Sequence, residues 1–152
     1  FGRKKKKEIP YNLVVCSEDI ENYGKEFIDT EVSIAVDIET TGLNFLEDTI
    51  HTISLSKSDD NFTTIVIPID HKEFKAGYQT KAELLKFVCK VLGNKKNRKI
   101  LQNATFDLKF LKRYGVEEVP NIWDTKLMQH LFNEEVPKSL SDLVYYYFPN
   151  EV

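Results

Sequence analysis

The sequence has 152 residues, 41% of them hydrophobic and 12% aromatic, with a formal net charge of −3. This length fits one domain with a buried core, and the net charge alone does not indicate a nucleic-acid-binding protein. No apolar run approaches the roughly 20 residues of a transmembrane helix. Cys16 and Cys89 lie in apolar runs without metal-binding spacing, so we expect buried free thiols and neither disulfides nor zinc. These features favour an intracellular, cytoplasmic protein without a membrane partner.

The distribution of charge is more informative than its sum. Basic runs occur at residues 3–7 and 95–99, whereas acidic residues gather around Asp37, Glu39 and Asp48. Basic segments can contact a phosphate backbone while an acidic pocket holds metal, although a solvated tail is the favoured explanation of the first run. We interpret residues 1–10 as a basic linker and residues 11–152 as the domain.

In chain order, the pattern of apolar residues predicts alternating strands and helices. Strands are expected at residues 11–16, 32–38, 51–56, 62–69 and 99–101. Helices are expected at residues 17–27, 80–93, 104–114, 125–132 and 139–147, with Ser17, Thr80 and Asp124 at N-cap positions.

The order of these elements predicts the fold class. The short polar turn at residues 57–61 indicates a β-hairpin, so the strands from 32 to 69 should form an antiparallel meander. The later alternation of strand and helix then gives a mixed five-stranded sheet flanked by helices, an α/β domain. In this arrangement the strand at 99–101 should lie next to Asp37 and Glu39, where ligand sites form in such sheets.

Two acidic residues stand at the end of the apolar run 32–38. Asp37 and Glu39 are two positions apart, so in a strand their side chains point to the same side and their charges repel. A divalent cation such as Mg²⁺ or Mn²⁺ would relieve this repulsion, because hard ions prefer oxygen ligands. The ordinary alternative is a strand that simply ends in solvent.

A third carboxylate follows the short strand at 99–101. Asn103 falls at the strand end and Asp107 in the first turn of the next helix. An Asp in a first helical turn is commonly only a partner of the helix dipole. Because the strand at 99–101 should lie beside Asp37 and Glu39, we favour instead a site that all three carboxylates share.

Two motifs resemble those of a known family. Asp37-Ile38-Glu39-Thr40-Thr41-Gly42-Leu43 and Asn103-Ala104-Thr105-Phe106-Asp107 are similar to motifs of the DEDD 3′–5′ exonucleases, most closely the proofreading domain of family A (bacterial DNA polymerase I-like) DNA polymerases. The resemblance covers residues 11–148. Supporting matches are Ile67–His71, Tyr114–Val116, Trp123–Thr125 and Ser139-Leu140.

The resemblance implies an RNase H-like fold and two-metal catalysis with Mg²⁺ or Mn²⁺. It implies that Asp37, Glu39 and Asp107 hold the two ions. It also implies that the 3′-terminal nucleotides of a single-stranded DNA contact four further residues, which are Thr40, Leu43, Asn103 and Phe106. Core packing explains Leu43 and Phe106, and turn formation explains Thr40, equally well from the sequence alone.

One part of the family pattern is missing. The family carries a fourth carboxylate on a late helix, in a Tyr-x-x-x-Asp or His-x-x-x-Asp pattern. Tyr147 and Glu151 have similar spacing but fall on an earlier helix, so we regard the match as coincidence. We expect a domain truncated at its C-terminal side, with the fourth carboxylate and a polymerase domain in a longer chain.

Three functions follow from these observations. The first is a proofreading exonuclease that acts on the primer terminus of an attached polymerase. The second is an RNase D-like exonuclease that trims RNA 3′ ends and shares the same carboxylates. The third is a catalytically silent nucleic-acid-binding module, which the clustered carboxylates disfavour because unused clustered acids destabilise a fold.

Overall fold

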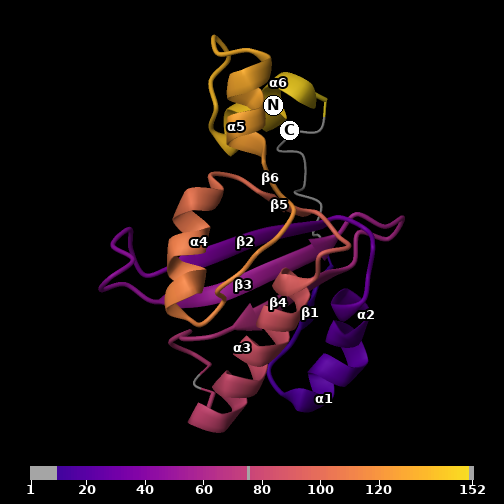
Figure 1. Ribbon diagram of the computed structural model, residues 1–152, viewed down its shortest axis with the longest axis vertical. Helices are drawn as coiled ribbons and strands as arrows, with labels where there is room; N and C mark the ends of the chain where they lie inside the picture. The colour runs from indigo at the N-terminus through magenta and orange to yellow at the C-terminus, as the bar shows by residue number, and fades with distance from the viewer. Residues whose placement is uncertain (1–9, 75, 151–152) are drawn as a thin grey trace, which may run out of the picture.

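The structure, a computed structural model, describes residues 10–74 and 76–150. One mixed sheet runs through it in the order β1-β4-β3-β2-β5-β6 (Figure 1). Its strands are β1 (Asn12–Leu13), β2 (Ile34–Thr40), β3 (Ile50–Lys57), β4 (Thr64–Pro68), β5 (Lys99–Leu101) and β6 (Ile122–Asp124). The helices are α1 (Ser17–Asp19), the π-helical η1 (Ile20–Gly24), α2 (Lys25–Ile28), α3 (Tyr78–Gly93), α4 (Ala104–Arg113), α5 (Thr125–Phe132) and α6 (Leu140–Tyr147).

The predicted α/β class and the antiparallel meander β2-β3-β4 are confirmed. β5 lies parallel to β2, with Ile34 opposite Lys99, as expected for the strand next to the acidic pair. The predicted number of five strands is wrong, because β6 pairs in parallel with β5 as a sixth. This strand has only three residues and follows Pro120, too short a run for an apolar pattern to reveal.

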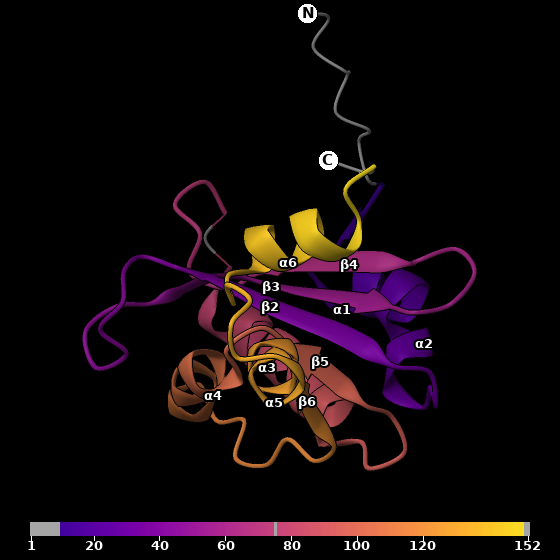
Figure 2. The same ribbon diagram turned by 90° about the horizontal axis from the view of Figure 1, so that it is seen from above.

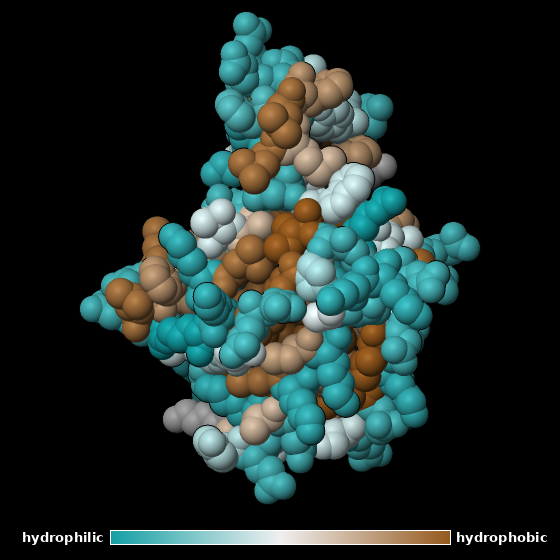
Figure 3. Space-filling view, viewed as in Figure 1, coloured by the Kyte–Doolittle hydropathy of each residue, from teal (hydrophilic) through white to brown (hydrophobic). Residues whose placement is uncertain are grey.

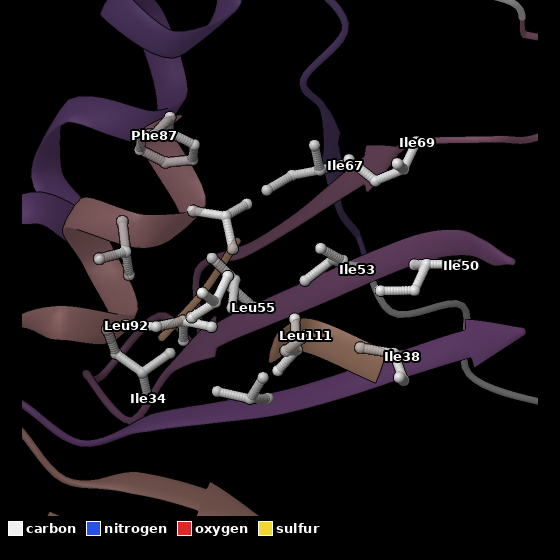
Figure 4. Packing of buried hydrophobic residues seen from close by; sticks show 14 of the residues in the cluster. Ile34, Ile38, Ile50, Ile53, Leu55, Ile67, Ile69, Phe87, Leu92 and Leu111 are labelled. Atoms are coloured by element: carbon white, nitrogen blue, oxygen red, sulfur yellow. The ribbon is translucent and has the colours of Figure 1, made fainter. Parts of the chain in front are cut away.

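The core lies between the sheet and helices α3 and α4. Along β2, Ile34, Val36 and Ile38 are buried while the residues between them face away from the core. Figure 4 shows Ile34 and Ile38 packing with side chains of β3 against Leu92 of α3 and Leu111 of α4. Helix α6 lies on the opposite side of the sheet (Figure 2).

Several local predictions need correction. The continuous helix expected at residues 17–27 is divided by the π-helical η1. Helix α3 begins at Tyr78 with Gly77 as its N-cap, not with Thr80, because the Gly77 carbonyl already accepts a hydrogen bond from the Lys81 N–H. Cys16 and Cys89 are free thiols but only partly buried.

Asp124 has a larger role than the predicted N-cap of one helix, because it contacts the starts of two helices. Its carboxylate accepts hydrogen bonds from the Lys126 and Leu127 N–H groups at 2.9 and 3.4 Å, which confirms the cap of α5. The same carboxylate accepts from the Asn103 and Ala104 N–H groups at 3.1 and 2.8 Å at the start of α4. The first N–H groups of a helix have no partners within the helix, so one buried side chain here satisfies two helix ends.

Replacing Asp124 should therefore cost more than the loss of an ordinary cap. For Asp124→Ala we expect the free energy of unfolding to fall by about 2 kcal/mol or more, against the ~1 kcal/mol typical of one N-cap. Ser139→Ala is the matched control, because Ser139 caps only α6 through the Asp142 N–H. Chemical denaturation measures both. Equal losses in the two variants would contradict the double cap.

Candidate active site

Strand β2 presents Asp37 and Glu39 on the side of the sheet that faces away from the core. Val36, just before the two acids, and Ile38, between them, are buried. The alternation of the strand therefore separates the acids from the apolar layer. Although Asp37 remains open to solvent, the surrounding protein partly encloses its carboxylate. This burial, together with the charge of Glu39, raises the pKa of Asp37.

Helix α4 brings Asp107 close enough to Asp37 for their charges to interact. Asp107 lies in the first turn of the helix, yet its side chain is buried, with only 5% of the residue exposed. Burial, with smaller contributions from the negative charges of Asp37 and then Asp124, raises the pKa of Asp107 to about 7. Burial and charge repulsion both disfavour the ionised form, so the ordinary role of a helix-dipole partner does not account for this side chain.

No cation of the protein neutralises these acids in the described residues. Among residues 10–74 and 76–150, Asp37, Glu39 and Asp107 form no ion pair with Lys, Arg or His. In the same residues, no three Asp, Glu, His or Cys side chains stand close enough together to hold an ion as they are. The donor set is nevertheless one of carboxylate oxygens, which suits Mg²⁺ or Mn²⁺.

Asp37 also borders a cavity on this side of the sheet. The cavity has a volume of about 340 Å³ and extends between β2, β3 and β5 toward the start of α6. Ser54 of β3 lies opposite Asp37 in the strand pairing and borders it too, as does Leu140. The acidic pair therefore faces an open space and not a packed layer.

Three of the four predicted substrate-binding residues lie together. Leu43, Asn103 and Phe106 line a pocket of about 240 Å³ between α4 and the loop of residues 41–49, which we call the β2–β3 loop. Asn103 has a left-handed backbone (φ 67°), and its N–H is held by Asp124. Thr40 is not among the lining residues, and its hydroxyl donates to the Gly42 carbonyl at 2.7 Å.

Sequence reasoning missed the side chains that shape the β2–β3 loop. The Asp48 carboxylate accepts hydrogen bonds from the Thr41 hydroxyl at 2.9 Å and the Asn44 N–H at 2.8 Å. The Arg113 guanidinium, at the end of α4, donates to the carbonyls of Phe45 and Asp48. An Arg in a last helical turn has an ordinary explanation in the helix dipole, so only Gly42 followed by acids indicated an organised turn.

Tyr147 contacts another helix within the described fold. Its hydroxyl donates to the Gln129 side chain of α5 at 2.7 Å. Glu151, the other member of the Tyr-x-x-x-Glu spacing, lies outside the described residues, as does the basic run at residues 3–7.

Hydrophobic side chains gather over α5 and α6, at the top of Figure 3. An apolar pocket of about 680 Å³ opens between the two helices, and Leu131 and Phe132 are largely exposed beside it. None of the described helices is both long and apolar enough to cross a membrane.

Comparison with known proteins places this geometry in a family. A family model described as 3′-5′ exonuclease matches residues 11–151, nearly the whole chain. DNA polymerase I of Synechocystis sp. is 29% identical over 120 residues, which are 78% of this chain and 12% of the polymerase. The chain thus spans about an eighth of that relative.

Solved structures share the fold at low sequence identity. The catalytic core of RRP6 from Trypanosoma brucei has a TM-score of 0.69 at 19% identity, over 91% of this chain and 34% of that one. Escherichia coli RNase D, described as an exoribonuclease, has a TM-score of 0.68 at 15% identity, over 94% and 34%. Brucella melitensis NrnC with bound Mg²⁺ has a TM-score of 0.63 at 22% identity, over 93% and 61%. The chain belongs to the 3′–5′ exonuclease family, with the mixed α/β fold of the DEDD exonucleases.

Proposed function

We propose that this chain is the proofreading 3′–5′ exonuclease domain of a family A DNA polymerase and removes the 3′-terminal nucleotide of single-stranded DNA. The observation that carries the proposal is the convergence of Asp107 with Asp37 from two elements far apart in sequence, within a chain matched over residues 11–151 by the exonuclease family. The attached polymerase domain and the primer terminus as partner belong to the proposal, supported by the likeness to DNA polymerase I.

The carboxylates fit the metal chemistry of the family. We propose that Asp37 and Glu39 from β2 and Asp107 from α4 hold two divalent ions, Mg²⁺ or Mn²⁺. Two such ions, when bound, activate a water and stabilise the attacking and leaving oxygens of a phosphodiester. Carboxylates bind metal in their deprotonated form, so Asp107 must give up the proton that burial favours. The protein itself then needs no covalent nucleophile.

The pocket beside the acids suits the end of a single strand. Leu43 and Phe106 offer apolar and aromatic surface to a terminal base, and base stacking on such side chains is tolerant of sequence. Asn103 adds a polar side chain at the same pocket. Thr40, next to Glu39 on β2, completes the proposed contacts with the terminal nucleotides. Tolerance of sequence is what a proofreading site needs, because any base can be misincorporated.

The RNase D-like alternative shares every one of these carboxylates. Likeness to RNase D and RRP6 lies below 25% identity and supports only the fold. The higher identity to a DNA polymerase favours DNA as the substrate. RNA differs by the 2′-hydroxyl, which a protein can accept or reject at the terminal sugar.

Removing a carboxylate should abolish turnover. For Asp37→Ala in the full-length protein we expect the rate on single-stranded DNA to fall more than about 100-fold, since the loss of partners of metal ligands alone costs 10–100-fold. The measurement is release of nucleotides from labelled oligonucleotides in Mg²⁺ or Mn²⁺. Asp60→Ala, an exposed acid in the turn between β3 and β4, is the matched control and should keep the wild-type rate.

Two comparisons separate the alternatives in the same assay. Matched DNA and RNA single strands should show faster degradation of DNA, and faster degradation of RNA would favour the RNase D-like function. Calorimetric titration with Mn²⁺ should show binding that Asp37→Ala weakens. A wild-type rate in Asp37→Ala, or no Mn²⁺ binding at all, would contradict the proposed site.

Stability of the metal-free protein should depend on Asp107. The pKa of this side chain is raised to about 7 from the ordinary value of 3.8. An acid with a raised pKa in the folded state loses its proton first in the unfolded state, so the free energy of unfolding falls as pH rises from about 4 to 7. The fall is on the order of 1.4 kcal/mol per pH unit within this window.

Asp107→Asn should remove this fall. Denaturation in EDTA at several pH values should show the variant gaining stability over wild type between pH 4 and 7 and keeping a constant advantage above. Asp60→Asn, the exposed control, should follow the wild-type curve. Parallel curves for Asp107→Asn and wild type would mean that Asp107 is not held among the other acids.

A further inference from the structure

We propose that Arg113 and Asp48 are positioning residues that hold the β2–β3 loop against α4 and thereby set the pocket for the 3′-terminal nucleotide. The inference rests on the proposed function and extends it to two side chains that touch neither the acids nor the substrate pocket. It concerns how the pocket is kept in shape, not the hydrolysis itself.

Arg113 binds the β2–β3 loop to α4. Its Nη1 donates to the main-chain carbonyls of Phe45 and Asp48 at 2.6 and 2.7 Å. Hydrogen bonds from a charged donor are roughly twice as strong as neutral ones. These contacts join residues more than sixty positions apart, so they fix the loop relative to α4 and not merely within itself.

Asp48 stabilises the β2–β3 loop through hydrogen bonds within the loop. Its carboxylate receives the Thr41 hydroxyl and the Asn44 N–H, and the Thr49 N–H in turn donates to the Thr41 hydroxyl at 2.9 Å. A Cβ at Gly42 would stand 2.5 Å from an Asp48 carboxylate oxygen. A side chain at position 42 would therefore require this carboxylate to shift.

Tyr114 holds the end of the loop where β3 begins. Its hydroxyl accepts from the Ile50 N–H at 3.1 Å and donates to the Asp70 carboxylate at 2.6 Å. The C-terminal end of α4 therefore contacts the loop at two points. Arg113 contacts the second half of the loop, and Tyr114 contacts Ile50, where the loop ends and β3 begins. Figure 1 shows this loop projecting from the sheet beside α4.

The loop side of the pocket combines Phe45, which is partly buried against the core, with Leu43, which is not held by packing. Leu43 is 85% exposed, so no neighbouring core fixes its position. Phe45 lines the pocket, and the Lys109 ammonium lies 5.6 Å from its ring centroid. The other side of the pocket is α4 itself, with Phe106 and Phe110. The contacts of Arg113 and Asp48 therefore act together with the packing of Phe45 to set the distance between the two sides.

This arrangement separates binding from chemistry. Asp37 and Glu39 lie on β2 before the loop, and Asp107 lies at the other end of α4 from Arg113. A looser loop should weaken contact with the terminal nucleotide while the carboxylates keep their places. An interaction used equally in the ground state and the transition state changes KM and leaves kcat unchanged.

The test compares exonuclease kinetics of variants in the full-length protein. For Arg113→Ala we expect KM for single-stranded DNA to rise about tenfold, the effect of losing one to two kcal/mol of binding, with kcat within about twofold of wild type. Arg113→Lys keeps a charged donor and should lie between the two. Lys112→Ala removes the same charge one residue earlier, where the exposed side chain has no role in the loop, and should match wild type.

A second variant acts on the same loop from the other side. Asp48→Asn should raise KM similarly, because the amide NH2 cannot accept a hydrogen bond as the carboxylate oxygen does. Residues that act through one loop are not additive, so the double variant should resemble the weaker-binding single variant. Affinity for the oligonucleotide measured in an Asp37→Ala background, where turnover is blocked, should show the same order.

The outcomes distinguish this inference from the proposed function. If wild type degrades no single strand, the proposed function fails. If wild type is active but Arg113→Ala keeps its KM, or lowers kcat and the melting temperature without changing KM, the positioning role is refuted. An equal rise of KM in Lys112→Ala would assign the effect to general charge.

Discussion

The electrostatic conflict between acids at the β2–α4 junction is the constraint on which the site depends. The apolar layer under β2 requires Val36 and Ile38 to point inward, so Asp37 and Glu39 must point outward together. Helix α4 then brings a buried Asp107 within the influence of Asp37. A fold that served only stability would not place these charges together without a neutralising partner, because burial and repulsion both oppose ionisation.

Helix α4 links the parts of the site that the sheet alone leaves separate. Its start is fixed by the Asp124 carboxylate, and Asp107 follows one turn later. Its end carries Arg113, which reaches the β2–β3 loop. Ten residues of helix span about 15 Å, so a single rigid element sets the place of an acid at one end and of a loop at the other. Displacement of this helix would therefore disturb both functions of the site.

Local sequence patterns predicted much of the fold. The alternation in β2, the hairpin after β3 and the cap of α5 are short-range features, and the structure contains them. β6 escaped prediction because Ile122 and Trp123 are partly exposed and the strand is short. The burial of Asp107 and the contacts of Arg113 depend on residues distant in sequence, which periodicity cannot reveal. The metal ligands and substrate contacts remain predictions.

The outer strands of the sheet are very short. β1 has two residues and β6 has three, so each border offers few free backbone N–H and C=O groups. Long exposed borders invite another chain to add a strand, which leads to fibres and mispaired assemblies. Growth of this sheet by such addition is therefore disfavoured at both margins. Among the described residues, large exposed apolar side chains gather instead on α5 and α6.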